Sequence, residues 1–291
     1  MTSKQRLLAM RATERLVPPE ELNKLLKFKM ADLGFGFDQF GMERESVLLA
    51  YAIGRCIYKY WFRVTSRGQE YIPDEGRVLI VPNHSGVLPI DAMMIWIDLW
   101  LKKDAPRPMR AVVDNFAGFL PFINTAMYRV GQVVGARRNF EDLLESNQLM
   151  AVFPEGAKGT GKLYKDRYKL IKFNVGFIEL SIKHRVPIIP TAVVGCEEQY
   201  AMMYNVKAIA AMISFPYFPI TPLFPLLGPL GMVPLPVRYH IRYGEPIHFY
   251  NDYGPQTLEN PETVRMLADK VQLKVEEMIQ GLLEERKGIF S

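Results

Sequence analysis

Short apolar runs of strand length alternate with amphipathic stretches of helix length through most of this chain. Such alternation predicts an α/β fold, with a mostly parallel central sheet flanked by helices. In such sheets ligands bind beyond the carboxyl ends of the strands, so polar residues that directly follow a strand are candidates for a functional site. The expected strands are 63–65, 78–81, 111–113, 133–134, 149–153, 187–194 and 239–242, and the expected helices include 90–101, 139–146, 173–183 and 262–286.

The length and composition are those of a globular chain. The 291 residues are 49% hydrophobic and 23% charged, which is sufficient for a sizeable core. We expect an N-terminal helical segment over 1–62 and a main domain over 63–291. The two cysteines, Cys56 and Cys196, form no CxxC pattern, so we expect free thiols, a reducing compartment and no zinc site.

Two segments have the apolar character of membrane-contacting structure. The helix expected over 43–62 ends in Tyr60 and Trp61, and its uncharged part is too short to span a bilayer. It could lie in the membrane interface or pack on the core, and the sequence leaves both open. The residues before it are charged throughout, so we expect no cleaved signal peptide.

The second segment, 208–237, has no charged residue and contains seven prolines. The prolines forbid a regular spanning helix, and irregular backbone cannot face hydrocarbon unsatisfied. We therefore expect this tract to lie shallowly in a membrane interface or to line an acyl chain; a long buried connection is the alternative. The expected location is the cytoplasmic face of a membrane, with peripheral or monotopic attachment.

The main candidate site begins where the strand 78–81 ends. Asn83 and His84 follow this strand, and Asp91 comes in the first turn of the next expected helix. A carboxylate beside a histidine fixes its tautomer and stabilises the imidazolium, as a general base requires. A solvated loop with Asp91 as a capping acid is the alternative.

Other chemistries fit less well. The run from Gly156 to Lys162 has the G-x-x-x-x-G-K spacing of a phosphate-binding loop, but Leu163 stands where a magnesium-binding Ser or Thr is required. No G-x-S-x-G nucleophile motif occurs. Basic and aromatic residues interleave over 158–173 without a nucleic-acid-binding signature, so we expect a phosphate or an anionic bilayer here and no nucleic-acid partner. A solvated charged face is the alternative.

Four blocks in order resemble the motifs of the glycerolipid acyltransferase superfamily. They are Asn83-His84 with Asp91, Gly135-Ala136-Arg137-Arg138, Phe153-Pro154-Glu155-Gly156 and Val186-Pro187-Ile188-Ile189-Pro190. The resemblance implies an α/β acyltransferase, membrane association and an acyl thioester donor, either acyl-CoA or acyl carrier protein. It implies a lysophospholipid or other glycerolipid acceptor, and neither a metal nor a cofactor.

The resemblance also assigns roles to residues. His84 would be the general base and Asp91 its partner. Arg137 or Arg138 would bind an acceptor phosphate, and Glu155, Gly156 and Lys158 would contribute to substrate binding. A non-catalytic lipid-binding or lipid-transfer protein on the same scaffold is the alternative.

One feature departs from the family pattern. The family usually has four residues between the histidine and the aspartate, whereas six, Ser85 to Ile90, separate His84 from Asp91. We expect a longer loop with the same pairing, which would border the acceptor pocket and leaves the acceptor class open.

Overall fold

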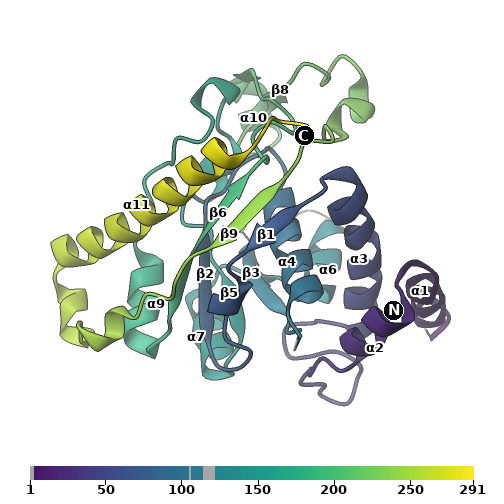
Figure 1. Ribbon diagram of the computed structural model, residues 1–291, viewed down its shortest axis with the longest axis horizontal. Coiled ribbons are helices and arrows are strands. Elements are labelled where there is room, and N and C mark those ends of the chain that lie inside the picture. Colours follow the sequence, from purple (N-terminus) through teal and green to yellow (C-terminus); the bar gives the residue numbers. More distant parts are fainter. Residues whose placement is uncertain (1–2, 105, 114–121) are drawn as a thin grey trace.

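A seven-stranded sheet forms the centre of the protein (Figure 1). The computed structural model describes residues 3–104, 106–113 and 122–291. Within these residues the strand order is β1-β9-β6-β2-β5-β3-β4, and every neighbouring pair is parallel except β6 with β9. The predicted fold class, a mostly parallel sheet flanked by helices, is therefore confirmed.

The elements have the following bounds. The sheet comprises β1 (Thr65–Arg67), β2 (Val78–Pro82), β3 (Met109–Val113), β4 (Val133–Val134), β5 (Leu149–Ala151), β6 (Ile188–Val194) and β9 (His240–Tyr243). A separate two-stranded sheet pairs β7 (Tyr204–Asn205) with β8 (Pro219–Ile220). The α-helices are α1 (Ser3–Leu16), α2 (Pro19–Leu26), α3 (Arg44–Cys56), α4 (Ile90–Lys102), α6 (Ile123–Arg129), α7 (Arg137–Glu145), α8 (Ala157–Thr160), α9 (Gly176–His184), α10 (Lys207–Met212) and α11 (Pro261–Glu285).

The alternation of side chains along β2 builds a core on each face of the sheet. Val78 and Ile80 belong to a cluster with the side chains of α3 and α4, whereas Leu79 and Val81 belong to one with those of α7, α9 and α11. Successive side chains of a strand point to opposite faces, so a strand buried on both faces is apolar throughout. The result is three layers, with α3 and α4 on one side and α9 and α11 on the other (Figure 1).

The N-terminal segment shares the core of the main domain. Leu48, Tyr51 and Phe62 are fully buried in the same cluster as Val78 and Ile80. Of the two alternatives left open for this helix, the membrane interface and the core, most apolar side chains of α3 pack on the core. Within the described residues, no helix is both long enough and apolar enough to span a bilayer.

Charge-free residues 208–237 fold into short elements that leave many apolar side chains in solvent. The tract includes most of α10, all of β8 and the 3-10 helix Gly228–Met232, and lies beside the C-terminus (Figure 1). We call residues 203–233, which contain β7 and most of this tract, the 203–233 segment. Its exposed large apolar residues are Met203, Tyr204, Met212, Ile213, Phe215, Leu226, Leu227, Leu230 and Val233.

One local expectation was wrong in detail. Asn139 was expected near the start of a helix over 139–146, but α7 begins at Arg137. The side-chain amide of Asn139 instead donates to the carbonyl oxygen of Val134 at 3.0 Å. Because α7 begins two residues earlier than expected, Arg137 and Arg138 lie in its first turn.

Candidate active site

The side chains of His84 and Asp91 are hydrogen-bonded. His84 lies two residues after β2, Asp91 lies in the first turn of α4, and 2.8 Å separates Nδ1 of the imidazole from Oδ2 of the carboxylate. Asp91 is fully buried, and it also accepts the backbone N–H groups of Ser85 at 2.9 Å and Ala92 at 2.8 Å. When Nδ1–H donates to Asp91, the neutral ring keeps its lone pair on Nε2, the form that accepts a proton.

The six-residue loop between them folds against neighbouring segments. Gly86 has φ 91°, and a side chain there would lie 2.3 Å from the carbonyl oxygen of Cys196, so the position requires glycine. The backbone of Val87 donates to the carbonyl oxygen of Thr160 at 3.1 Å and accepts from the hydroxyl of Tyr217. The longer loop therefore packs against the protein while the contact between His84 and Asp91 is kept.

Glu155 lies behind His84 with its carboxylate directed into the protein. Oε1 accepts the backbone N–H of His84 at 2.8 Å, and Oε2 accepts the backbone N–H of Ile171 at 2.8 Å. Oε2 also lies 3.2 Å from the ammonium of Lys162. Both oxygens are thus engaged within the protein and the residue is 2% exposed, and its substrate-binding role stays a prediction.

Two residues to which the sequence analysis assigned no role, Phe153 and Gly159, lie against His84. The ring of Phe153 packs on the imidazole, with 4.3 Å between ring centroids. At Gly159 a side chain would lie 2.6 Å from the carbonyl oxygen of His84, so only glycine allows α8 to approach this closely. Gly159 belongs to the phosphate-loop-like run, whose glycines were a signal for close backbone approach.

The other predicted substrate-binding residues are more exposed than Glu155. Gly156 adopts φ 58° and ψ −158°, a conformation essentially restricted to glycine, and Lys158 is exposed on α8. The side chains of Arg137 and Arg138 are 74% and 90% exposed and form loose ion pairs one turn along α7, at 3.7 and 3.9 Å. Their roles in binding stay predictions.

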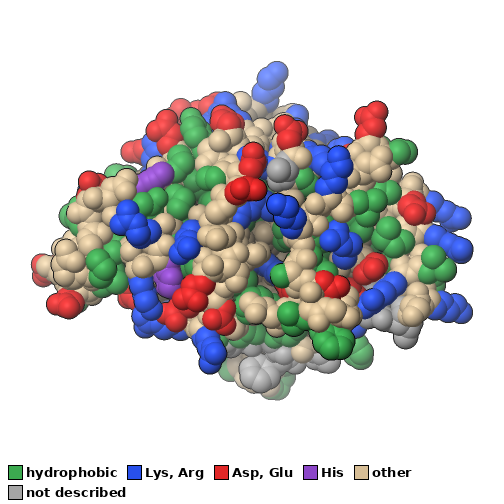
Figure 2. Space-filling view, turned by 90° about the horizontal axis from the view of Figure 1, so that it is seen from below, with side chains coloured by type: hydrophobic (Ala, Val, Ile, Leu, Met, Phe, Trp, Pro, Cys, Tyr) green, Lys and Arg blue, Asp and Glu red, His purple; other side chains and the backbone are tan. Residues whose placement is uncertain are grey.

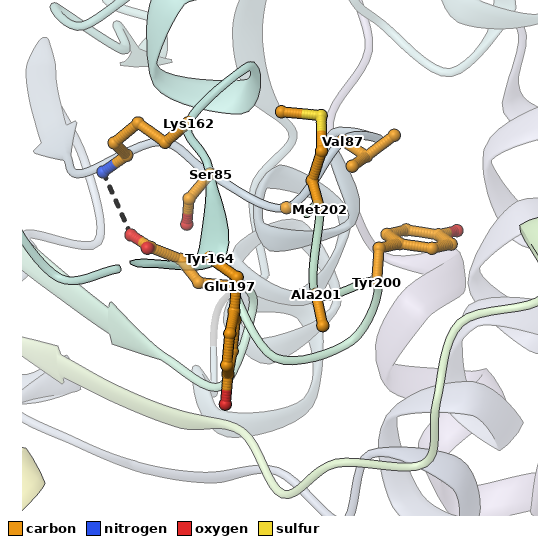
Figure 3. Close-up of a pocket in the computed structure, with 9 residues that line it drawn as sticks. Ser85, Val87, Lys162, Tyr164, Glu197, Tyr200, Ala201 and Met202 are labelled. Atoms are coloured by element: carbon orange, nitrogen blue, oxygen red, sulfur yellow. Dashed lines mark ion pairs between the residues drawn. The ribbon is translucent and has the colours of Figure 1, made fainter. Parts of the chain in front are cut away.

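A small hollow lies beside the His84 loop (Figure 3). Lys162 and Glu197 point toward one another across it, with 3.0 Å between Nζ and Oε1. Glu197 was not singled out from the sequence, although it comes three residues after β6 and so lies at the same edge of the sheet as His84. Burial raises the pKa of Glu197, and the charge of Lys162 opposes that rise. Among the described residues, no group of three or more His, Cys, Asp and Glu side chains is placed to hold a metal ion.

Comparison with known proteins identifies the family. The family described as Acyltransferase matches residues 63–194, which include the site. An uncharacterized protein of Mycobacterium tuberculosis is 38% identical over 258 residues, covering 88% of this chain and 72% of that protein. The chain belongs to the glycerolipid acyltransferase superfamily. The resemblance expected from the four motif blocks is thus confirmed.

Two further proteins that this acyltransferase is similar to have names that refer to lipid synthesis. A human protein named DGAT1/2-independent enzyme synthesizing storage lipids is 25% identical over 230 residues, covering 79% of this chain and 63% of that protein. The crystal structure of the 1-acyl-sn-glycerophosphate acyltransferase PlsC of Thermotoga maritima superposes with a TM-score of 0.52 at 16% identity, covering 99% of this chain and 100% of that one. At this identity the likeness concerns the fold. The family match supports acyltransferase activity.

Proposed function

We propose that this protein transfers a fatty acyl group from an acyl thioester to a hydroxyl of a glycerolipid or lysoglycerolipid, with His84 as general base. The observation that supports this most directly is the 2.8 Å contact between His84 Nδ1 and Asp91 Oδ2 at the carboxyl edge of the sheet. Ligands of parallel α/β sheets bind at this edge.

The proposed reaction needs no enzyme nucleophile. As the acceptor oxygen attacks the thioester carbonyl carbon, its proton passes to Nε2 of His84, and Asp91 stabilises the resulting imidazolium. The tetrahedral intermediate collapses with cleavage of the C–S bond, and the departing thiolate takes the proton from the imidazolium. General-base assistance of this kind contributes about a hundred- to ten-thousand-fold in rate.

Substrate binding in this proposal uses the exposed cations around the site. Arg137 or Arg138 would pair with an acceptor phosphate, because a guanidinium matches phosphate geometry with two parallel hydrogen bonds. Lys158 would add a further positive charge near Gly156. The donor would be acyl-CoA or acyl carrier protein, whose acyl chain requires an apolar surface.

We also propose that the protein works at a membrane surface on its cytoplasmic face. The exposed apolar side chains of the 203–233 segment support this, because large apolar patches mark interaction sites. The outward face of α1 combines basic and apolar residues: Lys4, Leu7, Leu8, Arg11 and Arg15. Such a helix suits an anionic bilayer. Lys and Arg side chains gather, with hydrophobic ones between them, at the right-hand end that carries α1 (Figures 1 and 2).

A thiol-release assay tests the proposed function. Purified protein is given acyl-CoA or acyl carrier protein thioesters with a panel of lysophospholipids, diacylglycerol and glycerol phosphate. Acceptor-dependent thiol release and an acylated lipid product are expected, and His84→Ala should remove both while leaving the melting temperature near that of the wild type. Lipid binding without thiol release under any donor would instead support a lipid-binding or lipid-transfer protein.

A further inference from the structure

Lys162 is a charged side chain buried beside the candidate active site. It is 6% exposed, and its ammonium lies 3.0 Å from Glu197 Oε1 and 3.2 Å from Glu155 Oε2. It also donates to the carbonyl oxygen of Lys169 at 3.2 Å. The ammonium is thus surrounded by two carboxylates and one carbonyl oxygen. Burying such a group is costly unless it is paired in this way.

This arrangement explains the phosphate-loop-like spacing from Gly156 to Lys162. In a phosphate-binding loop the lysine reaches toward the ligand phosphates. Here the lysine turns inward and pairs with two buried carboxylates. Two glycines of the run serve close packing instead, since Gly159 lies against His84 and a side chain on Gly161 would lie 2.8 Å from the ring of Tyr217.

The two carboxylates that hold Lys162 each hold a second segment. The other oxygen of Glu155 accepts the backbone N–H of His84, and the other oxygen of Glu197 accepts the backbone N–H of Tyr168 at 2.8 Å. The ammonium therefore joins the loops that follow β2, β5 and β6. These are parallel neighbours whose carboxyl ends share one edge of the sheet.

We infer that Lys162 is a positioning residue for acyl transfer, because its ammonium holds Glu155 against the backbone of His84 and so fixes the imidazole relative to Asp91. The inference rests on the proposed function to the extent that His84 is the base. Lys162 itself touches neither imidazole nor substrate in this proposal.

The charges around Lys162 show why its loss should matter. Without the ammonium, two buried carboxylates, Glu155 and Glu197, would face one another. The neighbouring Glu198 is itself a carboxylate, paired with Arg286 at 2.7 Å and with the hydroxyl of Tyr168, so it supplies no positive charge. Two such carboxylates share a proton until rising pH removes it, and their repulsion then separates them. Burial opposes the charge of Lys162, but the two carboxylates together raise the pKa of its ammonium above the usual value.

Kinetics of Lys162→Met and Lys162→Arg test the inference. Lys274→Met, which removes an exposed lysine on α11, is the matched control. Lys162→Met should lower kcat by about 10- to 100-fold with little change in either KM, as for a displaced catalytic group. Its kcat should fall further as pH rises, because the carboxylate pair then loses its shared proton. Lys162→Arg keeps the charge and should recover most of the rate without that added pH dependence.

A spectroscopic readout separates this inference from the proposed function. The chain has four histidines, so the ring N–H of His84 can be assigned by NMR with His84→Ala. The wild type and Lys162→Arg should show a Nδ1–H proton shifted downfield by its bond to Asp91, and folded Lys162→Met should lose that shift. An unchanged signal, or a kcat for Lys162→Met equal to that of Lys274→Met at every pH, would overturn the inference. If the wild type releases no thiol while Lys162→Met still loses the downfield Nδ1–H signal, the result counts against the proposed reaction alone.

Discussion

Glu155 Oε1 lies 2.8 Å from the backbone nitrogen of His84, although the two residues are 71 positions apart in the chain. The strands before them, β2 and β5, are adjacent and parallel, with Ile80 opposite Ala151. The Asn83-His84 and Phe153-Pro154-Glu155-Gly156 blocks are therefore parts of one hydrogen-bonded unit. A substitution at Glu155 should disturb the candidate base even if Glu155 never contacts substrate.

We expect Asp91→Asn to lower kcat by about a hundred- to ten-thousand-fold. Oδ2 of Asp91 accepts from both His84 and the backbone N–H of Ser85, and Oδ1 accepts the backbone N–H of Ala92. The NH2 group of an asparagine would therefore oppose a backbone N–H in either orientation, and the neutral amide cannot stabilise the imidazolium. Asp98→Asn is the matched control, since Asp98 is also fully buried on α4 and accepts from Tyr243 at 2.9 Å. Steady-state kinetics and thermal melts should show a stability loss for the control and a rate loss for Asp91→Asn. If Asp91→Asn turns over at nearly the wild-type rate, the hydrogen bond between Asp91 and His84 does not contribute to catalysis.

Arg137→Ala and Arg138→Ala should each change the free energy of unfolding by less than about 0.5 kcal/mol, because both side chains are exposed and loosely paired. If the acceptor carries a phosphate, removing the arginine that binds it should raise the acceptor KM by about 10- to 100-fold. The KM of the donor should stay unchanged. Equal increases in both KM values would show that the arginine does not recognise the acceptor.

Membrane attachment should resist salt and yield to detergent. Each fully buried leucine contributes about 1.5–3 kcal/mol, so apolar side chains of the 203–233 segment should dominate binding. In liposome flotation, the double variant Leu226→Gln and Leu230→Gln should float less than the wild type. Leu273→Gln, at an exposed position on α11, should float normally. Release by salt alone would identify the basic residues of 158–172 or of α1 as the anchor.

Stability should fall as pH decreases through the range in which histidine takes up a proton. Burial lowers the pKa of His240, with a smaller contribution from Arg238, and burial also lowers the pKa of His184. The unfolded chain therefore binds these protons at a higher pH than the folded one does, and the folded state loses stability from about pH 6.5 downward.

Urea unfolding at about pH 7.5 and pH 5.5 measures this effect. His240→Gln should reduce the stability difference between the two pH values, because glutamine does not titrate and can still bond to Thr65, whose hydroxyl lies 2.8 Å from His240 Nδ1. An equal difference in His240→Gln and wild type would mean that other groups control the acid sensitivity.

The sequence by itself determined the features that depend on local pattern. Strand and helix periods, 2 and about 3.6 residues, are written in consecutive residues, so the α/β class and most element positions could be predicted. His84 and Asp91 are separated by one short loop, so their proximity could be inferred despite the longer gap. The order of the four motif blocks predicted the family.

The tertiary structure decided where side chains point and what covers them. Whether α3 packs on the core or on a membrane depends on residues that are distant in sequence, as does the inward direction of Glu155. Lys162 and Glu197 come from loops 35 positions apart, and only the parallel pairing of strands brings those loops to one edge. Burial and charge pairing are set by the whole packed molecule, whereas spacing in a sequence specifies only what lies within a few turns of the same segment.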